Sequence, residues 1–198
     1  VLKRYEDALR DGDRIYSLLT GIGSATGGDK GKLLPSVNTC ISSIQQACED
    51  ANIDPASISY IETCGSGDAD EDRLEVGALC SLFGNQYDNN KPATVIGSVK
   101  ADIGHTGAAS ALASIAKTSL CLYHSVLPPL RNARPDQSRF REYSQFTLRQ
   151  TPQYWLRDRI AGPRRALASS FGTGGTCGHV ILEQVEQHNK ILDVSPVL

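Results

Sequence analysis

The 198-residue chain contains no methionine, only one tryptophan and no long uninterrupted apolar run. Because translation begins at a methionine, we expect the chain to be cut from a longer protein. Its first residues also lack the basic, apolar and small-residue order of a signal peptide. The most apolar window, residues 107–123, is shorter than a membrane span and is interrupted by serine, threonine and lysine. That window predicts a buried helix, and we expect no membrane span.

A strong charge of either sign is also absent, since the formal net charge is −2. Without a basic field, neither nucleic acid nor an anionic membrane is an expected partner. Residues 128–164 are a local exception, predicted to be an irregular, Arg-rich excursion: through Arg165 they carry nine arginines against three acidic residues. This local positive charge favours an acidic protein partner.

Cysteine pairs of the CxxC type are missing, although the chain has six cysteines. Most of them lie in apolar runs, and with no export signal they predict reduced thiols and a cytoplasmic protein. The four histidines make no ligand-like spacing with these cysteines, so we expect no metal site. The cysteines are Cys40, Cys48, Cys64, Cys80, Cys121 and Cys177.

Helices and strands alternate along the chain. In residues 36–52 the apolar positions recur every three or four residues, as on one face of a helix. Further helices are predicted at residues 70–83 and 108–123, the latter lined with small residues and therefore expected to be central. Strands are predicted at residues 14–19, 58–62, 94–99, 165–170 and 179–183. The alternation predicts an α/β domain with a mixed, mostly parallel sheet and packed helices, finished by a strand pair.

Two glycine clusters invite a nucleotide-binding interpretation, and both fail it. Residues 21–27 miss the dinucleotide-binding spacing by one residue, and residues 27–33 lack the spacing and the Ser or Thr of a phosphate loop. Both clusters therefore predict flexible surface loops.

Three stretches place small or reactive residues just after predicted strands. They are Tyr60-Ile61-Glu62-Thr63-Cys64-Gly65-Ser66-Gly67-Asp68, Gly97-Ser98-Val99-Lys100-Ala101-Asp102-Ile103-Gly104-His105, and Ser169-Ser170-Phe171-Gly172-Thr173-Gly174-Gly175-Thr176-Cys177-Gly178-His179. Ligands of open α/β sheets bind beyond the carboxyl ends of strands, so we expect the first two stretches to converge. His105 precedes a helix start, which opposes protonation and favours a neutral hydrogen-bond donor. A structural histidine that binds its own loop is the alternative.

In order and spacing, these stretches resemble the three C-terminal signature regions of β-ketoacyl synthases. Those regions are a Glu-Ala-His-Gly-Thr-Gly-Thr loop, a Ser-Val-Lys-x-x-x-Gly-His segment and a Ser-Ser-Phe-Gly-x-Gly-Gly-Thr-x-x-His turn. The opening of the chain is similar to the family's Leu-Lys-Arg-x-x-x-Ala-x-x-Asp-Gly-Asp-x-Ile-Tyr. The resemblance implies the C-terminal half of a thiolase-like fold at residues 1–186, followed by a tail or linker at residues 187–198.

The resemblance also implies a reaction, a decarboxylating Claisen condensation of acyl and malonyl thioesters in fatty-acid or polyketide synthesis. The thioesters are carried on the phosphopantetheine arm of an acyl carrier protein, with no bound cofactor. The family's nucleophilic cysteine lies in the N-terminal half, an expected partner of this chain. His105 matches one of two histidines that hydrogen-bond the thioester oxygen. Lys100 matches a lysine that supports the site, and Glu75 matches its acidic neighbour.

Further matches concern the carrier arm and the acyl tunnel. Ser66 keeps the first hydroxyl of the arm-binding loop, whereas Asp68 replaces its second threonine. Phe171 matches an aromatic gate beside the tunnel. The gate's flexible hinge corresponds to Gly172, Thr173, Gly174 and Gly175.

Cys64 stands at the position of the family's other histidine. A thiol is a weak donor, and losing one such donor typically costs about 2.7 to 4 kcal/mol of transition-state stabilisation. This departure and Asp68 are similar to the chain-length-factor-like synthase domains of polyunsaturated-lipid and glycolipid synthases.

Three hypotheses follow. The chain is part of a condensing acyltransferase and is inactive as an isolated fragment. Alternatively, it is a non-catalytic partner domain that shapes the acyl tunnel of an active synthase in a homodimer or pseudo-heterodimer. In the third hypothesis, Cys64 and His105 form a pair that hydrolyses thioesters.

Overall fold

The computed structural model describes residues 1–28, 33–84, 92–131, 144–157, 160 and 162–185. A six-stranded sheet in the order β1-β8-β7-β2-β3-β5 forms the middle of the molecule. The β7–β2, β2–β3 and β3–β5 pairs are parallel, and the β1–β8 and β8–β7 pairs are antiparallel. The mixed, mostly parallel sheet predicted from the sequence is therefore confirmed. The strands are β1 Leu18–Thr26, β2 Tyr60–Glu62, β3 Thr94–Gly97, β5 Phe146–Leu148, β7 Arg165–Gly172 and β8 Thr176–Glu183.

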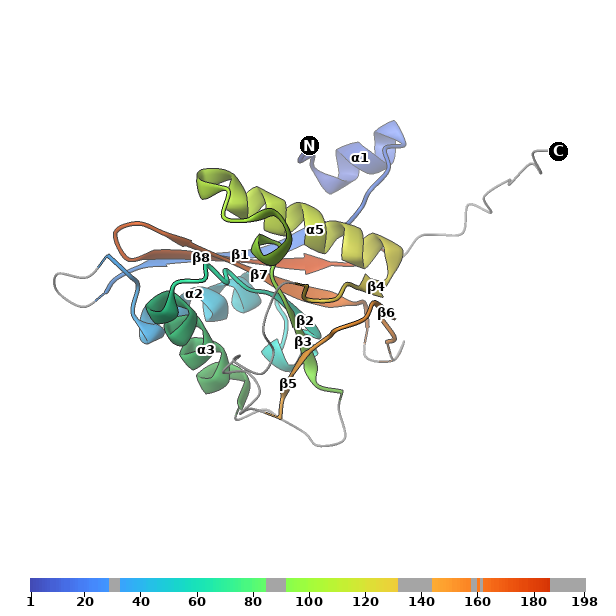
Figure 1. Cartoon of the computed structure of the whole chain (residues 1–198). Coiled ribbons are helices and arrows are strands. Elements are labelled where there is room, and N and C mark those ends of the chain that lie inside the picture. Colours follow the sequence, from blue (N-terminus) through green and yellow to red (C-terminus); the bar gives the residue numbers. More distant parts are fainter. Residues whose placement is uncertain (29–32, 85–91, 132–143, 158–159, 161, 186–198) are drawn as a thin grey trace.

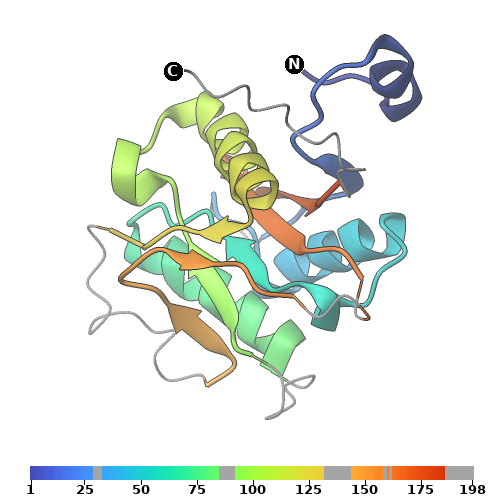
Figure 2. The same cartoon turned by 90° about the vertical axis from the view of Figure 1, so that its right-hand side faces the viewer.

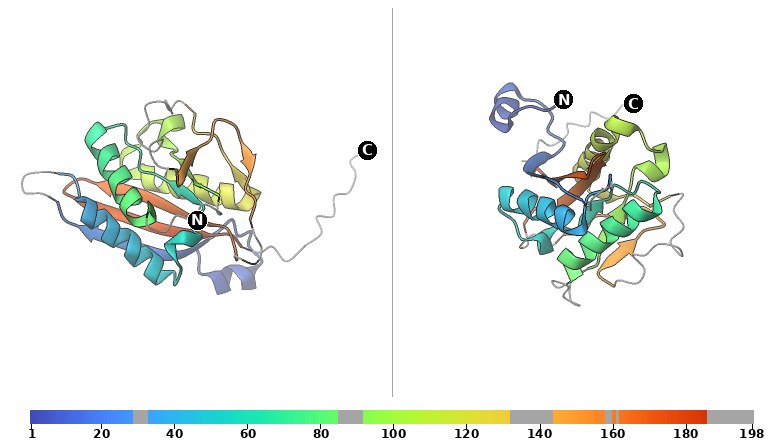
Figure 3. Two further views of the ribbon diagram at one scale, coloured as in Figure 1. Left: turned by 90° about the horizontal axis from the view of Figure 1, so that it is seen from below. Right: turned by 90° about the vertical axis from the view of Figure 1, so that its left-hand side faces the viewer.

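Helices cover both faces of this sheet. Helices α2 (Val37–Asp50) and α3 (Ala69–Phe83) lie on one face, and α5 (Ser110–His124) crosses the other (Figures 1 and 2). Alternate strand residues point to opposite faces, so Ile61 joins the core beneath α2 and α3 while Tyr60 joins the core beneath α5. Seen from below, α2 and α3 lie side by side in front of the sheet (Figure 3).

The predicted helices agree closely with the observed ones. Ser36 caps α2, its Oγ accepting the Thr39 N–H at 3.1 Å, and the chain leaves α3 at Gly84. The expectation of a central α5 is not met within this chain. One side of α5 packs on the sheet, and the other side is open, with Leu112 and Leu120 exposed.

Residues 21–27 were predicted to form a flexible surface loop. This prediction is wrong, because most of these residues lie in strand β1. Strand β1 runs through Gly21 and Gly23, which lie directly under α2. A Cβ on Gly21 would lie 2.1 Å from the Ala47 carbonyl oxygen, and one on Gly23 would lie 1.9 Å from the Ser43 carbonyl oxygen. The glycines therefore allow a helix to pack on a strand at backbone contact.

Several short elements escaped prediction. Helix α1 (Tyr5–Asp11) lies outside the layers (Figures 1 and 3), and the strand predicted at residues 14–19 begins only at Leu18. The Arg-rich stretch predicted to be irregular contributes β5 to the main sheet. It also contributes β6 (Gln153–Tyr154), which pairs with β4 (Val126–Leu127). Part of that stretch and the predicted tail at residues 187–198 lie outside the described residues.

Candidate functional site

The parallel strands β7, β2 and β3 end at one edge of the sheet, and all three sequence motifs meet there. Cys64 follows β2, Lys100 begins the short helix α4 (Lys100–Ile103) after β3, and Phe171 lies at the end of β7. The N–H and the hydroxyl of Thr63 both donate to the carbonyl oxygen of Gly97, at 2.8 and 2.9 Å. The predicted convergence of the first two motifs is thus observed, and the third motif joins them.

Cys64 is buried, with 2% of its surface exposed. Burial raises the pKa of its thiol to about 11, and the nearby Glu75 carboxylate adds to this, while Lys100 and a hydrogen bond from the backbone of Phe171 oppose it. The side chain is therefore a protonated thiol at neutral pH. Such a group is neither an imidazole substitute nor an activated nucleophile.

Glu75 reaches this loop from α3. Its carboxylate accepts the N–H groups of Cys64 at 2.7 Å and Gly65 at 3.0 Å. Burial raises the pKa of Glu75 to about 7, although the two backbone hydrogen bonds and the charge of Lys100 act in the opposite direction. Lys100 itself is buried, and it lies close enough to Glu75 for its charge to act on that carboxyl; its supporting role stays a prediction.

His105 lies beyond α4 on an exposed turn. The N–H of Gly107 donates to its Nδ1 at 3.1 Å, and Gly107 opens a short 3-10 helix (Gly107–Ala109) that leads into α5. Because Nδ1 uses its lone pair in this bond, the proton of the neutral ring lies on Nε2. His105 therefore both binds its own loop, as one sequence hypothesis held, and presents an N–H donor.

The two carrier-arm candidates are engaged at the start of α3. Asp68 Oδ1 accepts the N–H groups of Asp70 and Glu71, both at 3.0 Å, so Asp68 is the N-cap of the helix. Ser66 Oγ accepts the Asp68 N–H at 3.2 Å. Their predicted contact with the carrier arm stays a prediction.

Phe171 is half-buried, and its ring packs edge-on against His179 with centroids 6.3 Å apart. The following turn contains Gly174 and Gly175 at φ +83° and +76°, a region that favours glycine. Gly175 is held on both sides, because its N–H donates to Leu33 O at 2.7 Å and its carbonyl oxygen accepts the Gly27 N–H at 2.9 Å. The predicted flexible loop at residues 27–33 thus binds the turn at both ends; residues 29–32 lie outside the described part.

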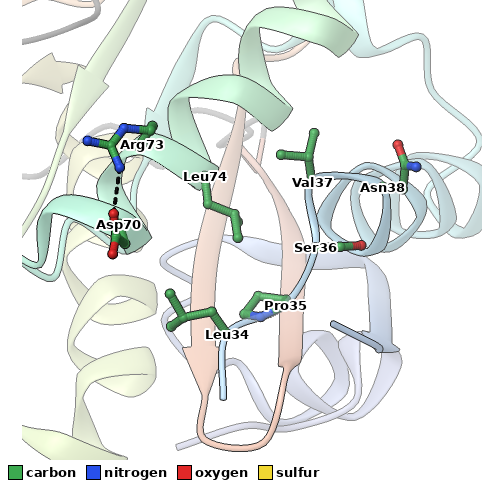
Figure 4. A pocket seen from close by; sticks show the side chains of 8 residues that line it. All are labelled: Leu34, Pro35, Ser36, Val37, Asn38, Asp70, Arg73 and Leu74. Carbon is green, nitrogen blue, oxygen red and sulfur yellow. Dashed lines mark hydrogen bonds and ion pairs between the residues drawn. The ribbon is translucent and has the colours of Figure 1, made fainter. Parts of the chain in front are cut away.

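A groove of about 510 Å³ adjoins this loop (Figure 4). Its walls come from the start of α2 with the segment before it and from the first turns of α3. Leu34 and Leu74 supply apolar surface, and Asp70 and Arg73 form an ion pair at its edge (Figure 4). The lining residues are Leu34, Pro35, Ser36, Val37, Asn38, Asp70, Arg73 and Leu74.

Sequence reasoning missed two buried polar groups next to the site. Ser43 Oγ donates to Gly23 O at 2.9 Å and contacts His179 Nδ1 at 2.9 Å, so the imidazole is the donor in the second bond. Burial lowers the pKa of His179 to about 3. The other group is Glu62, a carboxylate at the end of a buried strand that forms an ion pair with Lys117. A charged residue inside an apolar strand was the available signal.

All six cysteines are free thiols. Within the described residues, no group of three or more His, Cys, Asp or Glu side chains is arranged to hold a metal ion. No helix in that part of the chain has the length and apolar character needed to cross a membrane.

The family "Beta-ketoacyl synthase, C-terminal domain" matches residues 16–134. Polyketide synthase PksN of Bacillus subtilis is 38% identical over 196 residues, which cover 94% of this chain and 3% of that protein. One polyunsaturated fatty acid synthase chain from Thraustochytrium is 35% identical over 193 residues, covering 94% of this chain and 7% of that protein.

Solved structures agree with these sequence matches. The ketosynthase from module 6 of the bacillaene synthase of Bacillus subtilis superposes with a TM-score of 0.82 at 36% identity, covering 93% of this chain and 33% of that one. The predicted thiolase-like fold is therefore confirmed, and the chain spans a third of that ketosynthase. The chain belongs to the β-ketoacyl synthase family, as a C-terminal domain of that family.

Proposed function

We propose that this chain is the C-terminal half of a condensing β-ketoacyl synthase domain within a larger polyketide or fatty-acid synthase. In the reaction, a cysteine of the N-terminal half takes an acyl group from an acyl carrier protein. A malonyl thioester on a second carrier then loses carbon dioxide, and the resulting enolate attacks the acyl thioester, forming a carbon–carbon bond and releasing the cysteine. The chain spans 3% and 7% of the two synthases above, so the activity belongs to the complete protein.

The hydrogen bond from the Gly107 N–H to His105 Nδ1 carries this proposal. It leaves the Nε2–H of an exposed imidazole free to donate to the malonyl thioester oxygen as that oxygen gains charge. A donor fixed in orientation before the reaction stabilises the developing oxyanion without reorganising. Lys100 and Glu75 are both buried, and the Glu75 carboxylate holds the backbone of the Cys64 loop.

His105→Ala in the complete protein tests the proposal, with decarboxylation of the malonyl carrier measured directly. The expected result is a loss of about a hundredfold to a thousandfold or more in rate, because Cys64 stands at the position of the family's other histidine. His124→Ala is the matched control, since His124 lies at the opposite end of α5. An unchanged decarboxylation rate in the His105 variant would refute the catalytic role.

The buried Cys64 thiol favours a second candidate, a non-catalytic chain-length-factor-like domain that shapes the tunnel of an active partner. A protonated thiol with a pKa of about 11 gives little support to an oxyanion. This candidate predicts that no acyl group becomes attached to the synthase domain when it is offered a carrier protein loaded with an acyl thioester. Acylation at an upstream cysteine would contradict it.

The third hypothesis, thioester hydrolysis by Cys64 with His105, is disfavoured, because Cys64 is a buried protonated thiol whereas His105 is exposed.

The partner that we propose first is the N-terminal half of the same synthase domain. Leu112 and Leu120 are exposed on the side of α5 that does not pack on the sheet, and Ile103 is exposed at the end of α4. Apolar side chains grouped on one helix face indicate an interaction surface. Covered by the other half, α5 would become the central helix that the sequence suggested.

Acyl carrier protein is the second proposed partner, with its phosphopantetheine arm as substrate carrier. The arm would pass Ser66, Asp68 and the turn at Gly175. The Arg-rich stretch would bind the acidic carrier; Arg131, one of its described arginines, is exposed and pairs with Asp102, in the His105 segment, at 3.2 Å. Carrier binding that does not weaken with salt would count against this docking.

We also propose that the protein is dimeric, on the basis of its family membership, and cytoplasmic, on the basis of its free thiols.

A further inference from the structure

The carboxylate of Glu62 is completely buried and accepts hydrogen bonds from three different donors. Its Oε2 accepts the Tyr60 hydroxyl at 2.6 Å and the ammonium of Lys117 at 2.7 Å. Its Oε1 accepts the backbone N–H of Val99. One side chain therefore ends β2 and contacts two other segments of the chain.

The segments that meet at Glu62 are those that carry the candidate catalytic groups. Glu62 stands two residues before Cys64, and Val99 stands directly before Lys100. Lys117 belongs to α5, the helix that follows the His105 turn. The positions of the Cys64 loop, the Lys100 segment and α5 relative to one another thus depend on a single carboxylate.

The surrounding residues are fitted to this arrangement. A Cβ on Gly97 would lie 2.1 Å from the Tyr60 hydroxyl, so only glycine leaves room for that hydroxyl to reach Glu62. The Tyr60 ring packs against Trp155, with centroids 5.7 Å apart, and the Lys117 ammonium lies 5.8 Å from the same ring. Burial and the adjacent carboxylate raise the pKa of Tyr60, which keeps its hydroxyl protonated as a donor.

A buried ion pair is a poor source of stability, because removing both charges from water costs about as much as their attraction returns. A well-packed apolar pair can often replace one without loss of stability. What an apolar pair cannot do is accept the Val99 N–H. The feature that needs the carboxylate is therefore the position of the loop that leads into Lys100.

We propose that Glu62, with Lys117 as its counter-ion, is a positioning residue that sets the geometry between Cys64, Lys100 and His105. The inference rests on the proposed condensing function of the site. Glu62 touches no substrate in this role. It acts by fixing the backbone before Lys100 and the helix after His105.

Two variants of the complete protein test this inference. Glu62→Gln keeps the size of the side chain but leaves only one accepting oxygen, so an amide NH₂ must face either the Val99 N–H or the Tyr60 and Lys117 donors. Glu62→Leu combined with Lys117→Met replaces the ion pair by an apolar pair. Because it leaves no unpaired buried charge, this double variant should fold even if Glu62→Gln does not. We expect both to lower kcat for malonyl-carrier decarboxylation at least tenfold, with KM changed less than twofold, at a folded fraction equal to that of the parent.

The matched control is Glu183→Gln, which breaks the ion pair of Glu183 with Arg165 at 2.8 Å, at the end of β7 remote from Phe171. It should leave kcat unchanged. Parental kcat in the folded double variant would overturn the inference and make the pair merely structural. His105→Ala separates the two proposals: if it leaves decarboxylation intact, the proposed function fails; if it abolishes decarboxylation while the Glu62 variants retain it, only the positioning role fails.

Discussion

The carboxylate of Glu75 accepts the backbone N–H of Cys64 at 2.7 Å, so this carboxylate holds the loop through its backbone. The neighbouring Gly65 N–H donates to the same carboxylate at 3.0 Å. A side chain at residue 64 can therefore change without loss of these two backbone hydrogen bonds. Residue 64 is therefore a suitable position for a gain-of-function substitution.

Cys64→His in the complete protein should raise the rate of malonyl-carrier decarboxylation by about a hundredfold to a thousandfold, because it supplies the second imidazole donor. The measurement is carbon dioxide release from malonyl carrier. Cys64→Ala is the control and should match the parent, since a thiol contributes little as a donor. A change in product length alone, without a faster decarboxylation, would favour the tunnel-shaping role.

Asp68 offers a test of carrier-arm binding that leaves the fold intact. Asp68→Asn removes a negative charge from the path of the negatively charged phosphopantetheine arm. Asparagine caps helices about as well as aspartate, so α3 should keep its stability. We expect KM for the carrier-bound substrate to fall with an unchanged unfolding midpoint. Asp70→Asn, in the first turn of the same helix, is the control and should leave KM unchanged.

The close packing of α2 on β1 predicts very different costs for two Gly→Ala substitutions. Gly23→Ala would place a Cβ 1.9 Å from a backbone oxygen of α2, so the helix must move and the fold should lose several kcal/mol of stability. Gly77→Ala, inside α3, would meet only the Val37 Cγ2 at 3.6 Å, and should raise stability by up to about 1 kcal/mol. Urea unfolding of the complete synthase domain distinguishes them; equal effects would mean that the helix can shift freely.

Periodicity and motif spacing predicted much of this architecture, and their failures have physical causes. Helix α2 was found because its buried residues recur every three or four positions. Strand β1 was missed because Gly21 and Gly23 lie under a helix, and close packing there removes the apolar side chains that would have marked a strand. Strand β5 was missed because it lies at the edge of the sheet within a charged stretch.

The residues of the candidate site were likewise predicted only in part. The position of Lys100 near Cys64 followed from the expected convergence of the first two motifs, whereas Glu75 and Phe171 were singled out only by the family resemblance; the structure brings all four residues together. Glu62 was not singled out, although it lies in the first of the three motifs, because its partners are 37 and 55 residues away in sequence. The charge in an apolar strand marks Glu62 as unusual, but it does not say which distant residues pair with it. A single sequence therefore predicts the groups at strand ends better than the contacts that orient them.

Two buried groups give the fold opposing pH dependences. The pKa of Glu75 is raised from 4.5 to about 7 by burial, so its contribution to stability is present at low pH and is lost as pH rises from 4.5 to 7. The pKa of His179 is lowered from 6.5 to about 3 by burial, so its contribution is present above pH 6.5 and is lost as pH falls toward 3. Each slope is about 1.4 kcal/mol per pH unit, and the two have opposite signs.

Between pH 4.5 and 6.5 these two contributions should cancel, and single substitutions should reveal each of them. Glu75→Gln leaves His179 unopposed, so the free energy of unfolding should fall relative to the parent as pH decreases across this window. His179→Asn keeps a donor for Ser43 and leaves Glu75 unopposed, so the free energy of unfolding should fall as pH increases. Urea unfolding of the complete synthase domain at several pH values measures both differences. Two variants with parallel pH profiles would show that neither group has the buried environment described above, because opposite slopes require both pKa shifts.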